Sequence, residues 1–286
     1  MNKWILGARP RTLPAAITPV LVGTSLIRTT HHGINWFNAA LALGVSLLLQ
    51  IGVNYANDYS DGVRGTDEVR VGPTRLVASG MAAAASVKRA AYLTFFFAAL
   101  LGSLLAVRTS LWLIGVGAIS ILAAWKYTGG ENPYGYQGFG EISVFVFFGL
   151  VATMGSYFAQ AEEVTWSSFL VAIPVGALSC ALLAINNLRD LPKDAEVGKL
   201  TLAVRLGDLK ARYFFIGLLV LAHVAVLLAV TISGWVLISV ALIPLTIQIS
   251  AKIIGGASGR DLIPLLGKVA RLQLLLSTTL AVALLY

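Results

Sequence analysis

Two stretches of the chain carry closely spaced carboxylates and carboxamides, and each stretch closes a long apolar run. The first cluster holds Asn54, Asn57, Asp58 and Asp61, which occupy positions i, i+3, i+4 and i+7. In a helix this spacing places all four side chains on one face. Asp67 follows beyond two glycines. Hard oxygen ligands of these kinds suit Mg²⁺ with a bound phosphate.

A second cluster of similar make-up lies far downstream. It contains Asn186, Asn187, Arg189 and Asp190, with Asp194 one helical turn later. One such cluster alone would equally mark the water interface of a membrane helix. Two clusters are harder to explain in that way, because acidic residues near hydrocarbon are costly and usually functional. We therefore expect both clusters to face one cavity.

Basic residues accompany both clusters. They are Arg64, Arg70, Arg75, Arg189, Lys193, Lys199 and Arg205. Carboxylates alone would suit a cation pathway, whereas carboxylates mixed with Arg and Lys suit a metal-bridged anion, above all a diphosphate. The Asp groups would hold Mg²⁺, the metal would hold phosphate oxygens, and the basic side chains would take the remaining charge.

A lipid-linked diphosphate explains why such a site would open into a membrane helix bundle. Ionisation of an allylic diphosphate yields pyrophosphate and a delocalised cation, and Mg²⁺ with Arg and Lys stabilises the leaving anion. The aromatic faces of Tyr55, Tyr59 and Tyr127 could stabilise the cation. Burial would keep water from quenching it, so that an electron-rich acceptor is alkylated instead.

The composition identifies the elements that must position these residues. The 286 residues are 57% hydrophobic and 12% charged, with a mean hydropathy of +0.82, which predicts an all-α, polytopic membrane protein. The formal net charge of +8 would also suit a nucleic-acid partner, but the placement of the charges argues against one. The single cysteine, Cys180, excludes a disulfide framework.

Nine apolar runs reach the length of a membrane span. They cover roughly 12–28, 36–58, 89–107, 110–127, 139–160, 167–187, 211–231, 234–254 and 266–285. The resulting topology leaves only Arg28 and Arg108 on one side, so that 19 of the 21 basic residues share the other side. By the positive-inside rule that side is cytoplasmic, and both clusters lie on it.

The loops on that side suggest how the clusters are covered. The loops after the second and sixth spans both carry Val-Gly, a basic residue and a Thr, which we interpret as a weak internal repeat within one domain over residues 1–286. A Gly/Pro/aromatic loop over residues 129–141 cannot be regular helix. It is either a plain connector or a lid over the cytoplasmic mouth.

Several motifs together resemble the UbiA superfamily of intramembrane aromatic prenyltransferases, over almost the whole chain. Those that resemble its 1,4-dihydroxy-2-naphthoate prenyltransferase branch are Arg9-Pro10-Arg11-Thr12-Leu13-Pro14, Asn57-Asp58-Tyr59-x-Asp61-Gly62 with Gly65-x-Asp67, Gly72-Pro73-x-Arg75, Asn132-Pro133-Tyr134-Gly135-Tyr136-x-Gly138-x-Gly140-Glu141, Asn186-Asn187-x-Arg189-Asp190, and Gly198-Lys199-x-Thr201-Leu202-Ala203-Val204-Arg205-Leu206-Gly207.

The resemblance implies a fold of nine transmembrane helices around a central cavity, with Asp58, Asp61, Asp190 and Asp194 as the catalytic residues that hold a Mg²⁺-diphosphate. The side chains expected to bind the substrates are Asn54, Asn57, Tyr59, Arg64, Asp67, Arg75, Tyr127, Asn186, Asn187, Arg189 and Lys199. It also implies that a polyprenyl diphosphate loses pyrophosphate as the prenyl group displaces the carboxylate of 1,4-dihydroxy-2-naphthoate. The products would be CO₂ and demethylmenaquinone, an intermediate of menaquinone biosynthesis.

Two departures from the family pattern leave roles open. Gly65 stands where many relatives have a third Asp, so the family pattern assigns no role to Asp67. A Tyr-x-x-x-Lys pattern of some relatives is absent after Tyr127, where Glu131 takes the place of the lysine. Which basic residue contacts the diphosphate therefore stays open.

Other functions remain alternatives at this stage. Within the family, 4-hydroxybenzoate or homogentisate could be the acceptor. Outside it, a cation or lipid transporter would be expected to carry acids on both membrane faces, whereas 11 of the 13 Asp and Glu residues lie on the basic side. A non-catalytic lipid-binding scaffold is the third reading. The expected location is a bacterial cell membrane, with the active site facing the cytoplasm.

Overall fold

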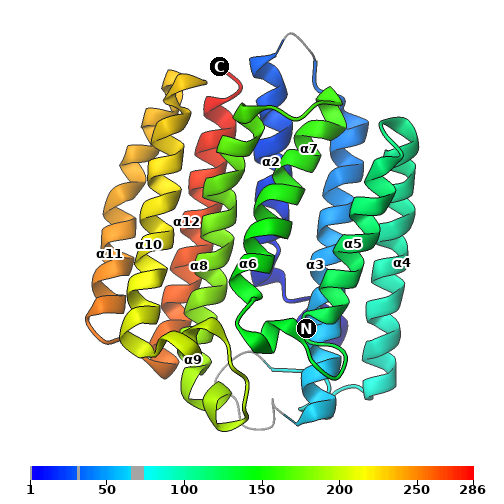
Figure 1. Cartoon of the computed structure of the whole chain (residues 1–286), viewed down its shortest axis with the longest axis vertical. Coiled ribbons are helices and arrows are strands. Elements are labelled where there is room, and N and C mark those ends of the chain that lie inside the picture. The colour runs from blue at the N-terminus through cyan, green and yellow to red at the C-terminus, as the bar shows by residue number, and fades with distance from the viewer. Residues whose placement is uncertain (1, 31–32, 66–73) are drawn as a thin grey trace.

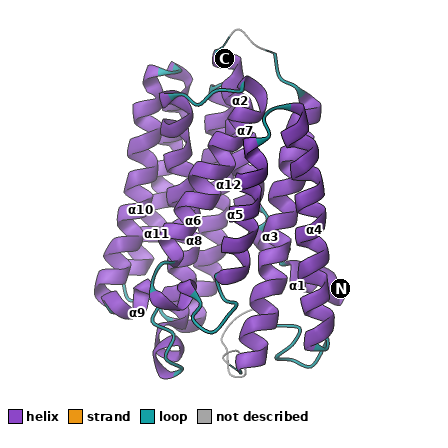
Figure 2. Cartoon of the chain, turned by 45° about the vertical axis from the view of Figure 1, so that its right-hand side comes forward, coloured by secondary structure: helices purple, strands orange, loops and turns teal. Residues whose placement is uncertain are grey.

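The described part of the computed structural model, residues 2–30, 33–65 and 74–286, consists of helices and loops without any strand (Figure 2). The α-helices are α1 (Lys3–Ala8), α2 (Pro14–Ser25), α3 (Trp36–Arg64), α4 (Ala84–Arg108), α5 (Trp112–Lys126), α6 (Gly140–Val144), α7 (Ala152–Ala161), α8 (Trp166–Glu196), α9 (Leu202–Leu206), α10 (Asp208–Leu228), α11 (Ile243–Ile254) and α12 (Leu262–Ala283). The predicted all-α class is confirmed.

Short 3₁₀ and π segments extend or join these helices. They are η1 (Pro10–Thr12), η2 (Leu26–Thr29), η3 (Tyr134–Gln137), η4 (Phe145–Val151, a π-helix), η5 (Ala229–Thr231), η6 (Gly234–Leu242) and η7 (Gly259–Asp261). Because η4 joins α6 directly to α7, one rod runs over Gly140–Ala161.

Seven rods in the described part are long and apolar enough to cross a membrane. They are Trp36–Arg64, Ala84–Arg108, Gly140–Ala161, Trp166–Glu196, Asp208–Thr231, Gly234–Ile254 and Gly259–Ala283. The predicted count of nine is therefore not confirmed. The runs at 12–28 and 110–127 form shorter elements, because the first continues from α2 into the 3₁₀ turn η2 and the second begins as helix only at Trp112.

The ends of the two cluster-bearing helices are set by local sequence signals. Asn35 caps α3 by accepting from the Asn38 backbone N–H at 3.1 Å. Gly65, with φ of 73°, ends the same helix in the left-handed conformation that glycine adopts at little cost. Thr165 and Ser168 form a reciprocal capping box at the start of α8. Both helices therefore run past their apolar stretch and carry the clusters on their last turns.

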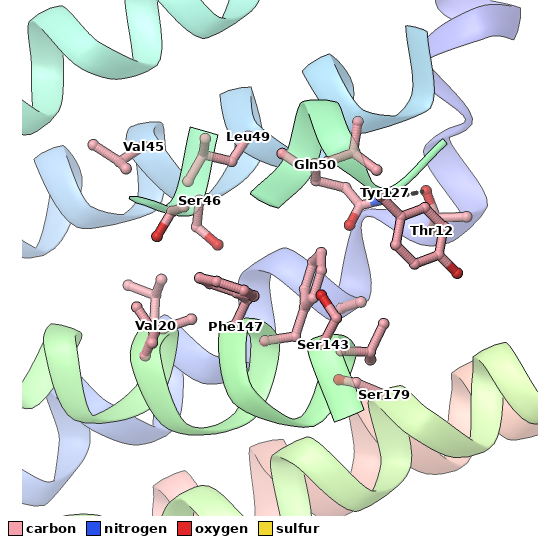
Figure 3. A pocket seen from close by; sticks show the side chains of 18 of the residues that line it. Thr12, Val20, Val45, Ser46, Leu49, Gln50, Tyr127, Ser143, Phe147 and Ser179 are labelled. Carbon is pink, nitrogen blue, oxygen red and sulfur yellow. Dashed lines mark hydrogen bonds between the residues drawn. The ribbon is translucent and has the colours of Figure 1, made fainter. Parts of the chain in front are cut away.

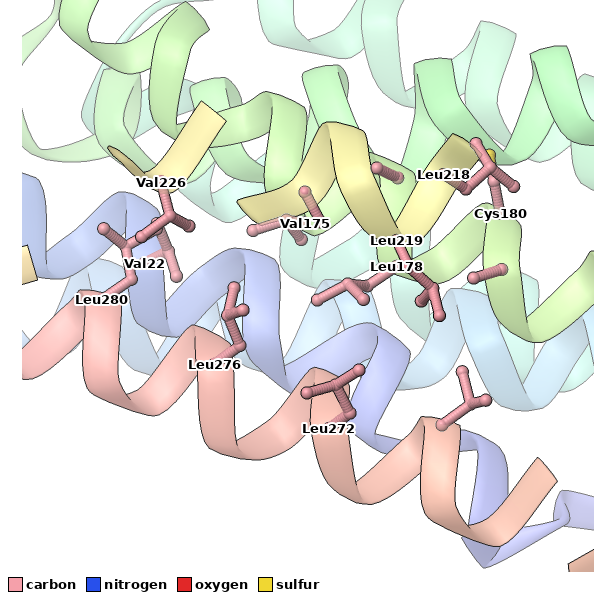
Figure 4. Packing of buried hydrophobic residues seen from close by; sticks show 14 of the residues in the cluster. Val22, Val175, Leu178, Cys180, Leu218, Leu219, Val226, Leu272, Leu276 and Leu280 are labelled. Carbon is pink, nitrogen blue, oxygen red and sulfur yellow. The ribbon is translucent and has the colours of Figure 1, made fainter. Parts of the chain in front are cut away.

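The main apolar core surrounds α8, whose most apolar window is 78% buried. Val175 and Leu178 of this helix pack against α10 and α12, as Leu219 and Leu276 illustrate (Figure 4). Figure 1 shows α8, α10, α11 and α12 on one side of the molecule and α3, α4 and α5 on the other, with α2, α6 and α7 between them. The middle rods therefore separate the two cluster-bearing helices.

Two glycines let the central rods approach closely. A Cβ added at Gly149 would lie 2.6 Å from the Cα of Gly176, and one at Gly176 would lie 2.9 Å from the Phe145 ring. Small residues at a helix crossing allow such backbone contact in membrane bundles. The contact fixes the π segment η4 against α8 and so sets the wall that Phe147 presents to the interior.

Candidate active site

The first cluster is tied to the amino-terminal segment of the chain. The Asn54 amide donates to the Ala8 carbonyl at 2.9 Å and to the Thr12 hydroxyl at 3.0 Å. Gln50, one turn earlier on α3, donates to the same hydroxyl at 3.1 Å. Thr12 therefore lies at the site, although the sequence singled it out only as part of a family motif.

Asp58 performs a structural task that its spacing did not reveal. The side chain is fully buried, and its two oxygens accept from the backbone N–H groups of Leu76 at 2.8 Å and Val77 at 3.0 Å. A carboxylate that accepts backbone N–H bonds is strongly held. Asp58 thereby fixes the turn over residues 76–80 against α3, and its predicted part in holding a metal stays a prediction.

Asp61 faces a tyrosine and an arginine. Its Oδ1 accepts from the Tyr136 hydroxyl at 2.7 Å, and its Oδ2 lies 3.5 Å from Nη2 of Arg75. Both Asp61 and Arg75 are buried. The loop over residues 129–141 thus reaches the first cluster, which supports its interpretation as a cover for the site over that of a plain connector.

The polar side chains of the second cluster are also held by hydrogen bonds and ion pairs. Asp190 accepts two bonds of 2.7 Å from the guanidinium of the adjacent Arg189, and Asp194 lies 3.7 Å from Nζ of Lys199. Asn187 donates to Glu141 at 2.9 Å, and Asn186 donates to the Leu182 carbonyl.

Tyr136 joins the two clusters. Its hydroxyl binds Asp61 of α3, and Nζ of Lys199, which pairs with Asp194 of α8, lies 5.0 Å from the centre of its ring. The Arg64 guanidinium lies over the same ring at 5.4 Å. Two helix ends far apart in sequence therefore meet through one loop residue.

Arg64 and Asn57 hold the start of the same loop. Arg64 donates to the carbonyls of Thr128 and Gly130, and the Thr128 hydroxyl donates to Asn57 at 2.8 Å. Burial raises the pKa of Tyr134, further along the loop, above its ordinary value. This residue therefore stays a neutral phenol whose hydroxyl donates to the Ala123 carbonyl at 2.8 Å.

A cavity of about 320 Å³ is lined by Asn57 of the first cluster and Asn186 of the second, and it runs into the bundle between α3 and the α6–α7 rod. Its polar end is lined by Arg11, Thr12, Gln50, Asn54, Asn57, Tyr127, Tyr134 and Asn186. The remaining wall is largely apolar, with Val45 and Leu49 of α3 facing Val20 and Phe147 (Figure 3). Asn57 and Val45 are twelve residues apart, so this wall extends about 18 Å at the rise of an α-helix.

The structure places the predicted substrate-binding residues in three positions. Asn54, Asn57, Tyr127 and Asn186 line the cavity. Arg64, Arg75, Asn187, Arg189 and Lys199 form the contacts around it. Tyr59 instead lies away from it, stacked on Trp125 with Lys88 over its ring. Asp67 lies outside the described residues.

Besides Thr12, three residues of the site were not identified by the sequence analysis as functional. They are Gln50, Tyr136 and Glu141, of which the last two lie in a loop motif whose signal was only a family resemblance. Tyr55 was expected to face a cation, but its hydroxyl donates to the Trp4 carbonyl at 2.7 Å instead. The faces of the tyrosines on α3 could not be assigned before the neighbours of that helix were known.

The donor types around the cavity fit a hard divalent cation. Carboxylate and carboxamide oxygens of Asp61, Asp194 and Asn57 come from both helices, and oxygen ligands of this kind suit Mg²⁺. Within the described ranges, no three His, Cys, Asp or Glu side chains stand close enough together to form a ready metal cluster. The protein groups that face the carboxylates are instead Arg75, Lys199 and Tyr136.

The family model described as the UbiA prenyltransferase family matches residues 16–284. The chain belongs to the UbiA prenyltransferase family. The UbiA prenyltransferase relatives named 1,4-dihydroxy-2-naphthoate octaprenyltransferase include one from Mycobacterium tuberculosis, 50% identical over 92% of this chain and 90% of that one. One from Haemophilus influenzae is 36% identical over 100% of this chain and 96% of its own.

Solved structures of UbiA homologues share the fold. The apo structure of the homologue from Aeropyrum pernix has a TM-score of 0.75 at 13% identity, covering 94% of this chain and 97% of that one. The homologue from Archaeoglobus fulgidus bound to DMAPP and Mg²⁺ has a TM-score of 0.67 at 14% identity, covering 98% and 99%. The predicted UbiA-type fold is confirmed.

Proposed function

We propose that this protein transfers a polyprenyl group from an allylic prenyl diphosphate to 1,4-dihydroxy-2-naphthoate, releasing CO₂ and pyrophosphate and giving the hydroquinone form of demethylmenaquinone, demethylmenaquinol. The observation that carries the proposal is the junction at Tyr136, which connects acidic residues of α3 and α8 and their basic partners, together with an apolar cavity whose polar end is lined by Asn57 and Asn186 of the same two clusters. Relatives that match nearly the whole chain carry the name of this activity.

The polar end suits a diphosphate. Arg64 and Lys199 flank Tyr136, and Arg75 lies beside Asp61, so that cations and carboxylates alternate around the mouth. An anion bridged to carboxylates needs such a mixture of charges. We assign Asp61 and Asp194, supported by Asp58 and Asp190, to hold Mg²⁺, which when bound supplies charge neutralisation for the departing pyrophosphate.

The apolar length of the cavity suits the prenyl tail. Val45, Leu49 and Phe147 offer a hydrocarbon wall, and the tail gains by leaving contact with water there. Tyr127 lines the junction of the polar and apolar parts, where an allylic cation would form. Its ring face stabilises such a cation, and the enclosed wall keeps water away from it.

The proposed prenyl transfer balances in atoms and electrons, and it needs no external oxidant. The C–O bond of the donor breaks with its electron pair going to pyrophosphate. The ring carbon that bears the carboxylate then bonds to the allylic carbon, and loss of CO₂ returns the electron pair to the aromatic ring. The protein must hold the ring against the allylic carbon, because proximity of this kind supplies much of the rate.

A panel of donors and acceptors tests this assignment. Purified protein in proteoliposomes with Mg²⁺ is given prenyl diphosphates of several lengths together with each aromatic acceptor, and products are identified by mass. We expect product with dihydroxynaphthoate, accompanied by one pyrophosphate and one CO₂. Alkylation of 4-hydroxybenzoate or homogentisate in its place would refute the acceptor assignment and leave the donor assignment standing.

The apolar wall of the cavity argues against the transporter alternative. A transport path needs polar groups along its whole length, yet the wall beyond Ser46 is formed largely by Val20, Val45 and Leu105. We also propose that the site faces the cytoplasm in a bacterial cell membrane, since the loops around it carry most of the basic residues. Ion flux through liposomes without a prenyl donor would favour the transporter.

A further inference from the structure

A second hollow lies at the turn between α11 and α12, away from the cavity described above. It has a volume of about 510 Å³ and is lined by Lys252, Gly255, Gly256, Ala257, Asp261, Pro264, Leu265 and Lys268. In Figure 1 this turn lies at the lower end of the molecule, the end that also carries α9. It thus belongs to the face that the positive-inside rule predicts to be cytoplasmic.

The two lysines of this hollow face it from different helices. Lys268 of α12 donates to Gln248 of α11 at 2.6 Å, so its ammonium reaches across the groove between the helices. Lys252 is one turn beyond Gln248 on α11, and its ammonium makes no hydrogen bond or ion pair with the described residues. The hollow is lined by two lysines and one aspartate, Asp261, so its net charge is positive.

Backbone features strengthen the attraction for an anion. The 3₁₀ turn η7 runs directly into α12, so the positive end of this helical rod lies in the turn that borders the hollow, next to Asp261. A Cβ at Gly256 would meet nothing within 4 Å, which shows that the turn leaves open space there. The hollow therefore offers room as well as charge.

The outer faces of α11 and α12 are apolar and exposed. Ile247 and Ile254 of α11 and Ile263 of α12 are 62%, 46% and 36% exposed. In a membrane-spanning bundle these faces contact acyl chains. A free phosphate would gain nothing from apolar surface, whereas a phospholipid with its phosphate between the lysines would also place its acyl chains against the apolar outside of the bundle, beginning at Pro264.

We propose that the hollow between α11 and α12 binds the phosphate headgroup of an anionic membrane phospholipid, with Lys252 and Lys268 as its cationic ligands. Anionic lipids enrich the cytoplasmic leaflet, and basic pockets between helices on that side are suited to their headgroups. This assignment is independent of the prenyl-transfer chemistry, because no residue of the hollow is part of the cavity that holds Tyr127.

The test measures lipid retention by the full chain. Wild-type protein is placed in nanodiscs of phosphatidylcholine with and without phosphatidylglycerol, and the lipids that survive gentle release are counted by native mass spectrometry. We expect retained phosphatidylglycerol, and a fall in apparent affinity of about five-fold for each of Lys252→Gln and Lys268→Gln. Arg89→Gln, an exposed cation on α4 at the same predicted face, is the matched control and should retain the lipid.

Other outcomes overturn the assignment. Equal retention of phosphatidylcholine would show that the hollow does not select charge, and unchanged retention by the double lysine variant would place the lipid elsewhere. Displacement of the lipid by millimolar inorganic phosphate would make the ligand a free anion. If the double variant does not fold, Lys252→Gln alone decides, because its exposed side chain makes no contact that folding requires.

Discussion

Tyr136 carries the connection between the acidic ends of α3 and α8, and its hydroxyl and its ring do so separately. The hydroxyl donates to Asp61, while the ring faces Lys199 and Arg64. Removing the hydroxyl leaves the ring contacts intact, so a single-atom change isolates the bond to the carboxylate.

The variant Tyr136→Phe is predicted to lower kcat/KM for the prenyl diphosphate by about ten-fold, as expected for loss of a hydrogen bond to a charged group. Steady-state kinetics with varied donor measures this. Tyr92→Phe is the control, since Tyr92 stacks on Trp125 outside the cavity. A variant with wild-type kinetics would remove Tyr136 from the site.

Glu141 contacts the second cluster through Asn187. Its Oε1 accepts from Asn187, whereas its buried Oε2 has no hydrogen bond with the described residues. Gln in its place can still accept from Asn187, and Ala cannot. We predict that Glu141→Ala lowers the free energy of unfolding by about 1–3 kcal/mol, and that Glu141→Gln costs less. Thermal unfolding in detergent compares them, and equal loss would contradict the positioning role.

At the scale of the helices, the crossing of η4 and α8 depends on the absence of side chains. Gly176→Ala would place a Cβ against the Gly149 backbone and the Phe145 ring. We predict a loss of about 1–3 kcal/mol in unfolding free energy from overpacking. Gly217→Ala on α10, where a Cβ would meet nothing within 4 Å, should be neutral or slightly stabilising. Similar melting temperatures for both variants would contradict the close approach.

The wall of the cavity predicts how donor length is limited. Val45→Trp on α3 would fill the apolar part opposite Val20 (Figure 3). The KM for a long polyprenyl diphosphate should then rise by about ten-fold or more while a short donor is unaffected, because lost tail burial costs roughly that much. Ile119→Trp, on the exposed face of α5, is the control. An equal effect on both donors would place the tail elsewhere.

The sequence predicted the helical bundle well, but it did not predict which side of each helix faces the site. Apolar runs and the positive-inside rule identified the helical bundle and the single end at which both clusters lie. Their count of nine spans is not confirmed, since α2 and α5 are shorter than the other seven and hydropathy cannot distinguish the 3₁₀ turn η2 from a continued helix. Tyr59 lies one residue past Asp58, about 100° further round α3, and the helix neighbours that bring Trp125 against that face are not visible in the sequence of α3.

The loop residues of the site could not be predicted at all by periodicity. Tyr136 and Thr128 reach the first cluster through a loop that has no helical period, and their partners Asp61 and Asn57 are far away in sequence. Asp58 matched the cluster spacing, yet its neighbours in space are the backbone N–H groups of Leu76 and Val77. Contacts between residues this far apart in the sequence depend on how the helices pack, which the periodicity of one segment does not reveal.

At the scale of the whole molecule, two polar ends meet within an apolar bundle. In Figure 1 the C-terminus lies at the upper end of the molecule and the N-terminus in its lower half. Asp61 and Arg64 at the end of α3 and Lys199 just after α8 contact Tyr136. Such an arrangement is unexpected for separate structural caps, each of which would satisfy its own helix. It is expected if one ligand spans both helices.

A double-mutant cycle on kcat/KM with Asp61→Asn and Asp194→Asn tests this claim most directly. If the two carboxylates hold one magnesium diphosphate, each single variant should lose at least about 10²-fold, and the double variant should be no worse than the poorer single one, since groups that act as a unit are not additive. Losses that multiply, or an Asp194→Asn variant with wild-type turnover, would contradict the shared site.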